Sequence, residues 1–283
     1  MKNIIADVGA MGPSVLSTNL SSLQLRILSA LVLAPIAVGA VYLGGPYFAV
    51  FLALSTAAMS YEWCQTSFVK NKSSYIILVT IWLLFSLYLG FEGYIQIAFI
   101  TVLICAIGVI SLTWFRREER EWKGAFLGPI YIGVPVLCLM ALRDDIENGF
   151  NLTIFLFFIV WATDIGAYFA GRSIGGPKIA PSISPNKTWA GLLGGMAASA
   201  IVAVLLNMYL LQLEIAPGML MLIGALLAVV AQSGDFAESG WKRRFAIKDA
   251  SNLIPGHGGV LDRLDGVLFV APVLYMIKTL VGF

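Results

Sequence analysis

The run "LTIFLFFIVWATDIGAYFA", residues 152–170, is almost entirely apolar and contains one charged residue, Asp164. A helix that crosses about 30 Å of hydrocarbon needs about 20 mostly apolar residues, so this run is long enough to span a membrane. The rest of the chain has the same character, because 59% of its 283 residues are hydrophobic and 12% are charged. A soluble domain carries roughly 25% charged residues. The composition therefore predicts an all-α, polytopic integral membrane protein.

Eight further runs of this kind flank residues 152–170, and Pro or Gly separates several of them. Together they predict nine transmembrane helices. The expected spans are residues 24–43, 47–66, 74–91, 94–114, 127–142, 152–170, 190–211, 218–236 and 265–282.

The basic residues give this arrangement an orientation. With nine spans, 16 of the 18 Lys and Arg residues lie on the side of the N-terminus, and only Arg143 and Lys278 lie on the other. Cytoplasmic segments carry an excess of Lys and Arg. The count therefore predicts that the N-terminus is inside and the C-terminus outside.

Three segments follow from this layout. Residues 1–22 are expected to be a juxtamembrane leader, residues 23–126 to hold four N-terminal transmembrane helices, and residues 127–283 to form a catalytic transmembrane domain of five helices. Two loops of that domain, 171–189 and 237–264, are expected to be cytoplasmic. Both combine Lys and Arg with Gly, Pro and Ser.

Asp164 is the most unusual residue of the sixth span. A carboxylate within a span is costly, and it usually serves a function or has a polar partner. Tyr168 follows four residues later and shares the same helix face. Either a functional site or a structural bond to a neighbouring helix would explain Asp164.

The segment "IPGHGGVLDRLDG", residues 254–266, concentrates polar residues just before the last span. Asp262 and Asp265 are three residues apart and share a helix face. Two carboxylates so close repel each other unless a cation lies between them, and Mg²⁺ takes carboxylate oxygens. Asp235, at the expected end of the eighth span, is a further candidate ligand.

The same segment holds the only histidine of the chain, His257, beside Gly258 and Gly259. Glycines allow a sharp turn or a close approach of the backbone to a ligand. His257 could bond a phosphate, orient a carboxylate, transfer a proton or have a purely structural role.

The basic run "WKRRFAIKD", residues 241–249, has two explanations. Lys242 and Arg243 could attract anionic lipid headgroups at the inner leaflet. They could also neutralise a triphosphate beside metal-binding carboxylates. Arg263 points away from both neighbouring aspartates and suits a phosphate.

The segment "SGWKRRFAIKDASNLIPGHGGVLDRLD", residues 239–265, resembles the signature of the phosphatidate cytidylyltransferase (CDP-diacylglycerol synthase) family. The pattern of that family runs from Ser through Lys-Arg and Lys-Asp to a Pro-x-His-Gly-Gly turn and Asp-Arg-apolar-Asp. Its polar elements fall on Ser239, Lys242, Arg243, Lys248, Asp249, His257, Gly258, Gly259, Asp262, Arg263 and Asp265. Trp241 is bulkier than the residue usual there.

Two other segments are similar to the family, "WATDIGAYFAGR" at 161–172 and "SPNKTWAG" at 184–191. The second departs from the family at Asn186, usually Lys, and at Ala190, usually Glu. The resemblance is close over residues 127–283, whereas the first four spans match only in hydrophobicity and number.

The resemblance implies a magnesium-dependent nucleotidyltransferase that joins CTP and phosphatidate to give CDP-diacylglycerol and pyrophosphate, in a bacterial-type inner membrane with its site on the cytoplasmic side. Mg²⁺ is the expected cofactor, with room for a second cation. No nucleic-acid partner is expected, and a homodimer is compatible with the sequence. The implied catalytic residues are Asp235, Asp262, Asp265 and His257, and the implied metal ligands are Asp164, Asp235, Asp262 and Asp265. The implied substrate-binding residues are Tyr168, Ser184, Lys187, Thr188, Lys242, Arg243, Lys248, Asp249, Gly258, Gly259 and Arg263.

Two other functions fit less well. A CDP-alcohol phosphatidyltransferase also combines membrane helices, paired aspartates and magnesium, but the tail after Gly266 has no Ala-Arg and no further aspartate. An ion-coupled transporter would explain Asp164. It would not explain the histidine-glycine turn and its Lys-Arg neighbour.

Overall fold

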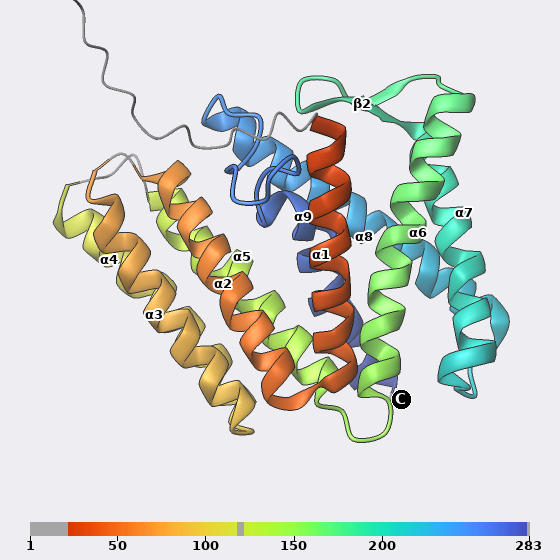
Figure 1. The fold of residues 1–283 in the computed structure, drawn as a ribbon, viewed down its shortest axis with the longest axis horizontal. Helices are drawn as coiled ribbons and strands as arrows, with labels where there is room; N and C mark the ends of the chain where they lie inside the picture. The colour runs from red at the N-terminus through yellow and green to blue at the C-terminus, as the bar shows by residue number, and fades with distance from the viewer. Residues whose placement is uncertain (1–21, 69, 118–121, 282–283) are drawn as a thin grey trace, which may run out of the picture.

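A computed structural model describes residues 22–68, 70–117 and 122–281. The expected leader, residues 1–22, lies almost wholly outside the described residues. Nine long α-helices fill the described part, and the last strongly apolar run ends near the C-terminus (Figure 1). Their bounds are α1 Ser22–Leu43, α2 Gly45–Ser67, α3 Lys72–Phe91, α4 Ile95–Phe115, α5 Trp122–Arg143, α6 Gly149–Ser173, α7 Trp189–Leu206, α8 Pro217–Arg244 and α9 Leu261–Val281.

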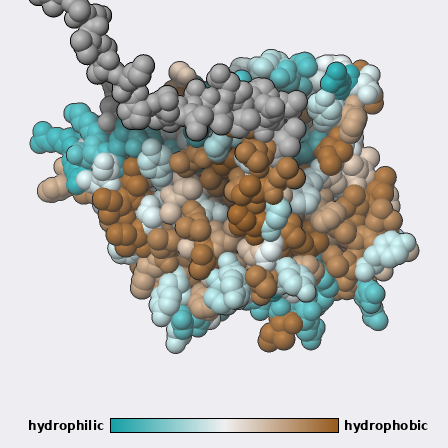
Figure 2. All heavy atoms as spheres, viewed as in Figure 1, coloured by the Kyte–Doolittle hydropathy of each residue, from teal (hydrophilic) through white to brown (hydrophobic). Residues whose placement is uncertain are grey.

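Seven of these helices, α3 to α9, are long and apolar enough to cross a membrane, counted over the described residues. The first helix contributes a shorter apolar stretch, Leu31–Leu43, and α2 carries Glu62 in its interior. Hydrophobic side chains cover the middle of the face drawn in Figure 2, and hydrophilic ones gather toward its ends. The fold is therefore that of an all-α, multi-pass membrane protein.

Arg143 and Lys278, the two basic residues expected on the side opposite the N-terminus, both lie at the end of the bundle that holds the α5–α6 turn. Arg143 Nε donates a 2.7 Å hydrogen bond to the carbonyl oxygen of Val41, at the end of α1. Lys278 on α9 forms an ion pair with Asp145. Both cations thus join helix ends at this side of the molecule.

The sixth and seventh helices approach each other closely at two glycines. A Cβ atom on Gly166 would lie 2.6 Å from the carbonyl oxygen of Gly194, and one on Gly194 would lie 2.8 Å from the carbonyl oxygen of Gly166. Small residues at such positions let membrane helices approach closely. The two helices therefore form a tight pair, which carries a β-hairpin at one end (Figure 1).

That hairpin corrects the expectation that residues 171–189 form a loop. The sixth helix continues to Ser173, and strands β1 (Lys178–Ala180) and β2 (Ser184–Thr188) then pair antiparallel. Lys178 pairs with Thr188 and Ala180 with Ser184. Short polar strands carry a weak periodic signal, which is why hydropathy alone missed them.

The expected loop at 237–264 also needs correction. The eighth helix runs on to Arg244, so Asp235 lies in the interior of the helix and not at its end. Residues such as Ala, Glu, Lys and Arg favour helix even where they are too polar for a membrane core. A loss of hydropathy marked the end of the apolar segment, but the helix itself continues.

Candidate active site

A cavity of about 500 Å³ opens between α6, the hairpin, the start of α7, and α8. The sixth helix contributes Asp164, Tyr168 and Arg172, which are four residues apart and therefore share one face. Three cationic side chains line the cavity together with two carboxylates; these are Arg172, Lys178, Lys187, Asp164 and Asp235. The cavity thus brings together residues from both segments, 161–172 and 184–191.

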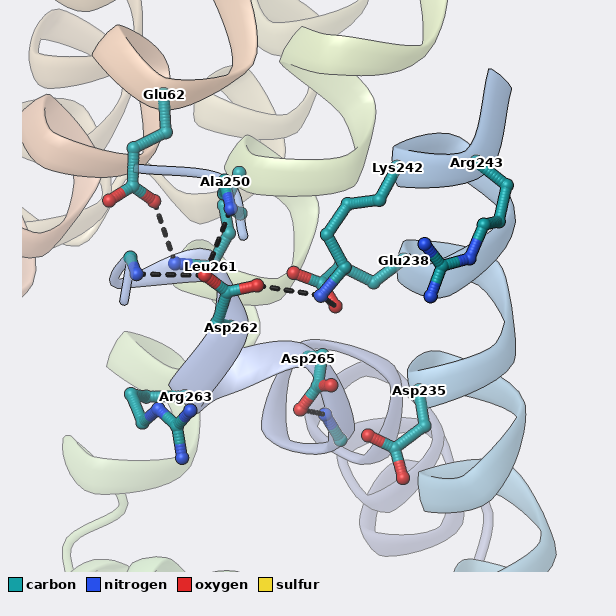
Figure 3. A network of polar contacts seen from close by, with 12 residues as sticks. Glu62, Asp235, Glu238, Lys242, Arg243, Ala250, Leu261, Asp262, Arg263 and Asp265 are labelled. Atoms are coloured by element: carbon teal, nitrogen blue, oxygen red, sulfur yellow. Dashed lines mark hydrogen bonds and ion pairs between the residues drawn. The ribbon is translucent and has the colours of Figure 1, made fainter. Parts of the chain in front are cut away.

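Lys187, on β2, forms an ion pair with Asp235, on α8. The carboxyl group of Asp235 also lies within hydrogen-bonding reach of that of Asp265, on α9 (Figure 3). Gly234 makes this approach feasible, because a Cβ atom there would lie 2.4 Å from the carbonyl oxygen of Asp265. The absence of a side chain at Gly234 therefore lets α8 and α9 bring two carboxyl groups together.

Asp262 has different partners from Asp265. Lys242 Nζ lies 2.6 Å from Asp262 Oδ1 and 2.6 Å from Glu238 Oε2. Asp262 Oδ2 accepts backbone hydrogen bonds from Gly259 at 2.8 Å and from Ala250 at 3.0 Å. Figure 3 shows Asp262 directed toward Lys242, and Asp265 toward Asp235. Asp262 is consequently bound within a network that joins the end of α8 to the start of α9.

Glu62, on α2, fixes the start of α9 from the opposite side. Its side chain accepts 2.8 Å hydrogen bonds from the backbone amides of Val260 and Leu261, and a 2.6 Å hydrogen bond from Ser251 Oγ. A Cβ atom on Gly259 would lie 2.7 Å from Glu62 Oε1, so only glycine fits there without displacement. The carboxylate thereby satisfies amides that a helix N-terminus leaves unpaired.

The turn before α9 brings His257 to the first helix. Its Nδ1 lies 2.7 Å from Ser29 Oγ of α1. The residue on either side has a positive φ, with Gly256 at 76° and Gly258 at 86°. Arg263 Nε donates to the carbonyl oxygen of His257 at 3.0 Å. The histidine therefore links the turn to α1, while Arg263 closes the turn from α9.

The other implied substrate-binding residues border the cavity or the loop between α8 and α9. Thr188 caps α7 by accepting a 3.0 Å hydrogen bond from the Gly191 amide. Arg243 Nε donates to Ile183 of the hairpin at 3.4 Å, and Ser184 begins β2. Lys248 and Asp249 lie exposed in the loop. Their roles remain predictions.

The implied metal ligands do not converge as one set. Asp235 and Asp265 are adjacent, and Asp164 lines the same cavity as Asp235. Asp262 instead holds Lys242 and two backbone amides. Over the described residues, no three His, Cys, Asp or Glu side chains are grouped closely enough to hold a metal ion. The i,i+3 spacing gave a common helix face, but it could not show that each aspartate has its own partner.

A sequence profile of the cytidylyltransferase family matches residues 24–281. The chain belongs to the cytidylyltransferase family. A relative in Brucella suis biovar 1 (strain 1330), named phosphatidate cytidylyltransferase, is 41% identical over 262 residues, which cover 91% of this chain and 93% of the relative. A protein of the same name in Bacillus subtilis (strain 168) is 37% identical over 210 residues, covering 72% of this chain and 77% of the relative.

The match to the cytidylyltransferase family includes most of the N-terminal helices, and the structure shows what one of them contributes. Glu62 and the Lys242 partner Glu238 were not singled out by the family signature at 239–265. Glu62 is the only acidic residue in the expected second span, 47–66. An acidic residue within an apolar run is unusual, so this feature of the sequence could have identified Glu62 as a candidate. Nothing in the local spacing marked Glu238 beyond its place four residues before Lys242.

Proposed function

We propose that this member of the cytidylyltransferase family is a phosphatidate cytidylyltransferase, which converts CTP and phosphatidate into CDP-diacylglycerol and pyrophosphate. The observation that carries the proposal is a single cavity, with three cationic and two acidic side chains, among helices apolar enough to span a membrane. A reaction between a soluble nucleotide and a lipid phosphate requires a polar site of this kind within reach of both.

The cations of the cavity suit a triphosphate. Arg172, Lys178 and Lys187 come from α6, β1 and β2 and face the same space. Phosphate binding by Lys and Arg is strengthened by charge. Gln232 also lines the cavity, and its buried Nε2 has no hydrogen-bond partner among the described residues. An unpaired buried donor is costly, so we expect Gln232 to donate to the nucleotide.

The carboxylates suit Mg²⁺. Asp235 and Asp265 lie within hydrogen-bonding reach, and two ionised carboxylates at that separation repel each other unless a cation or a proton is shared. Oxygen donors that leave positions for water and phosphate are what Mg²⁺ takes in nucleotide sites. We propose that Asp235 and Asp265 hold the ion, with Asp164 near enough for a second cation. When bound, Mg²⁺ neutralises developing charge on phosphate oxygens.

The side chains of the protein position the reactants and balance their charge. A phosphate oxygen of phosphatidate forms a bond to the α-phosphorus of CTP, and the bond from that phosphorus to the bridging oxygen breaks to release pyrophosphate. Lys187 and Lys178 would hold the leaving phosphates, and Lys242 would stabilise charge beside Asp262. Phosphatidate is already ionised at neutral pH, so the step needs no strong general base, and binding in line supplies much of the rate.

The membrane arrangement completes the proposal. We propose nine spans with the N-terminus inside, in a bacterial inner membrane, so that the cavity and hairpin face the cytoplasm, where CTP is found. The two basic residues at the opposite end, Arg143 and Lys278, are engaged in helix contacts, in keeping with that orientation. A homodimer stays a prediction that the mass of the detergent-purified protein can check.

The deciding experiment is pyrophosphate release from CTP by the purified protein in mixed micelles. We expect release that requires both phosphatidate and Mg²⁺, with CDP-diacylglycerol as the lipid product. Release that is independent of phosphatidate, or a product formed from CDP-diacylglycerol and an alcohol, would contradict the assignment. Lack of turnover together with proton or ion transport in vesicles would favour a transporter.

A further inference from the structure

A second cavity, of about 640 Å³, lies between α5, α8 and α9, with α2 at one side. Its lining includes Leu127, Val134, Trp241, Leu268 and Phe269. Of its described lining residues, only Glu238 and Arg244 carry charge. Because α5, α8 and α9 are all apolar enough to lie in a bilayer, this apolar groove sits where a lipid can reach it.

Aromatic rings form the wall of the groove nearest α2. Trp63 stacks on Trp241, with ring centroids 4.7 Å apart and an interplanar angle of 4°. It also stacks on Tyr131, with ring centroids 5.2 Å apart. Phe269 meets Tyr131 edge-on at 6.0 Å. Such interlocked rings give the groove a rigid wall, which limits the ordering cost of binding a flexible chain.

The inner end of the groove reaches the carboxylates of the candidate active site. Glu238 is 2% exposed and lines the groove, while its Oε2 binds Lys242. Two buried polar atoms, Glu238 Oε1 and the Tyr131 hydroxyl, have no hydrogen-bond partner among the described residues. Tyr131 interacts electrostatically with Asp265 and Asp235 as well. The groove is therefore apolar along its length and polar where it approaches the reacting groups.

The two cavities lie on opposite faces of α8. Successive helix residues are about 100° apart, so Asp235 and Ala237 point about 160° away from each other. Asp235 lines the cationic cavity, and Ala237, Gly240 and Arg244 line the groove. A nucleotide in the first cavity and a lipid in the second would thus approach the carboxylates from two sides.

We propose that this groove binds the diacylglycerol portion of phosphatidate, with an acyl chain along α5 and α9 and an ester carbonyl accepting a hydrogen bond from Tyr131. The inference rests on the proposed function and adds to it the place where the lipid lies. The nucleotide is the poorer occupant, because the lining offers few groups that could bind a base or a triphosphate. Arg244 lies at the exposed end of the groove, where it can bind an anionic headgroup.

Filling the groove tests this assignment. Gly240 lines the groove, and a Cβ atom there has its nearest neighbour, Ile183 Cγ2 of the hairpin, at 4.0 Å, so Gly240→Leu adds bulk beside the groove without a backbone clash. The matched control is Gly108→Leu, since Gly108 lies exposed in α4, with nothing within 4 Å of a Cβ atom. Neither glycine has a positive φ among the described backbone angles.

We expect Gly240→Leu to raise the KM for dioleoyl phosphatidate about tenfold, the effect of losing burial of about two methylene groups. The KM for CTP should stay unchanged, and a dihexanoyl analogue should be affected less. The Gly108→Leu variant should behave like the wild type. An increase in the KM for CTP alone, or equal effects on the long and short lipids, would overturn the proposal.

Photolabelling of the wild-type protein provides a test that does not depend on the folding of a variant. A phosphatidate with a diazirine on its acyl chain should label peptides from 127–135 and 237–244, and unlabelled phosphatidate should compete. Equal labelling by a matching phosphatidylcholine, or labelling confined to outer helix faces, would show that the groove has no preference for phosphatidate. If the wild type fails to release pyrophosphate from CTP, the proposed function fails; if it is active but unlabelled in the groove, only this inference fails.

Discussion

The carboxylate of Glu62, on α2, accepts a 2.8 Å hydrogen bond from the backbone amide of Leu261, the first residue of α9. The two residues are 199 positions apart, so one buried side chain joins the N-terminal helices to the segment that carries Asp262 and Asp265. An N-terminal helix has thereby become part of the support of the candidate active site.

Replacing Glu62 should destabilise the protein and reduce turnover. Glu62→Ala leaves two buried backbone amides and Ser251 without their acceptor, at a cost of about 3 kcal/mol or more. Glu62→Gln keeps one acceptor oxygen and should show a smaller loss. Thermal unfolding in detergent and the rate of pyrophosphate release measure both effects. Glu92→Gln, at an exposed carboxylate after α3, is the control. Wild-type stability of Glu62→Ala would contradict the role.

Asp265 and Asp262 should respond differently to substitution, because their partners differ. Asp265→Asn should lower the rate about 10²-fold or more, by analogy with removal of a preorganised charge, and should raise the Mg²⁺ concentration needed for half-maximal rate. Asp262→Asn weakens the contacts of this side chain with Lys242 and with the turn before α9. It should lower the rate without changing the Mg²⁺ requirement. Magnesium titrations at saturating CTP and phosphatidate separate the two. The same Mg²⁺ response in both variants would mean that the proposed division is wrong.

Cysteine labelling can check the orientation. The three native cysteines, Cys64, Cys105 and Cys138, are all buried. Ile146, in the α5–α6 turn, is 99% exposed, and Ser182 lies in the exposed turn of the hairpin. In whole cells, a membrane-impermeant thiol reagent should modify the Ile146→Cys variant and leave Ser182→Cys unmodified until the cells are opened. The reverse pattern would invert the topology.

Asp145 gives the protein a pH-dependent contact at the end opposite the cavity. Burial raises the pKa of Asp145, but hydrogen bonds from Lys278 and from the Asn148 amide outweigh it and hold the pKa below its usual value. A lowered folded-state pKa adds stability above the unfolded value of about 3.9, and that stability is lost as the pH falls through the folded-state pKa. Asp145→Asn should therefore lower the melting temperature by about 2 °C at pH 7, and the difference should shrink as the pH falls below the unfolded-state pKa and vanish below the folded-state pKa.

The neighbouring residue provides the control for that measurement. Burial raises the pKa of Asp144, although Arg143 partly offsets it. An acid with a raised pKa costs stability once it is ionised, so Asp144→Asn should keep or increase the melting temperature at pH 7. A loss in Asp144→Asn equal to that in Asp145→Asn would show that the ion pair with Lys278 is not the cause.

The helices of this protein were largely predictable from the sequence, because hydrocarbon thickness imposes their length and composition. The fourth helix, Ile95–Phe115, lies within one residue of the expected span 94–114 at each end. Hydropathy predicted the helix ends less well where a helix continues beyond its apolar residues. Residues 237–244 are polar enough to leave the membrane, yet they continue α8. The hairpin was missed because its strands are three and five residues long.

The candidate site was only partly predictable, because spacing along the chain does not specify partners across it. The segment 184–191 indicated Lys187 and the expected end of the eighth span indicated Asp235, but neither showed that the two form an ion pair. His257 looked like a residue for phosphate or proton chemistry, and the structure places its Nδ1 against Ser29 of α1. Long-range contacts of this kind depend on how helices cross, which no local pattern records.

Gly234 restricts how this enzyme family member can be redesigned. The backbones of α8 and α9 meet there without an intervening side chain, so the helix crossing sets how close the backbones of Asp235 and Asp265 lie. A methyl group at this point would move a whole helix, and a longer acid at either position could not restore both the distance and the direction of approach. Attempts to retune the site are therefore best made from the hairpin, where Lys187 can change without displacing a membrane helix.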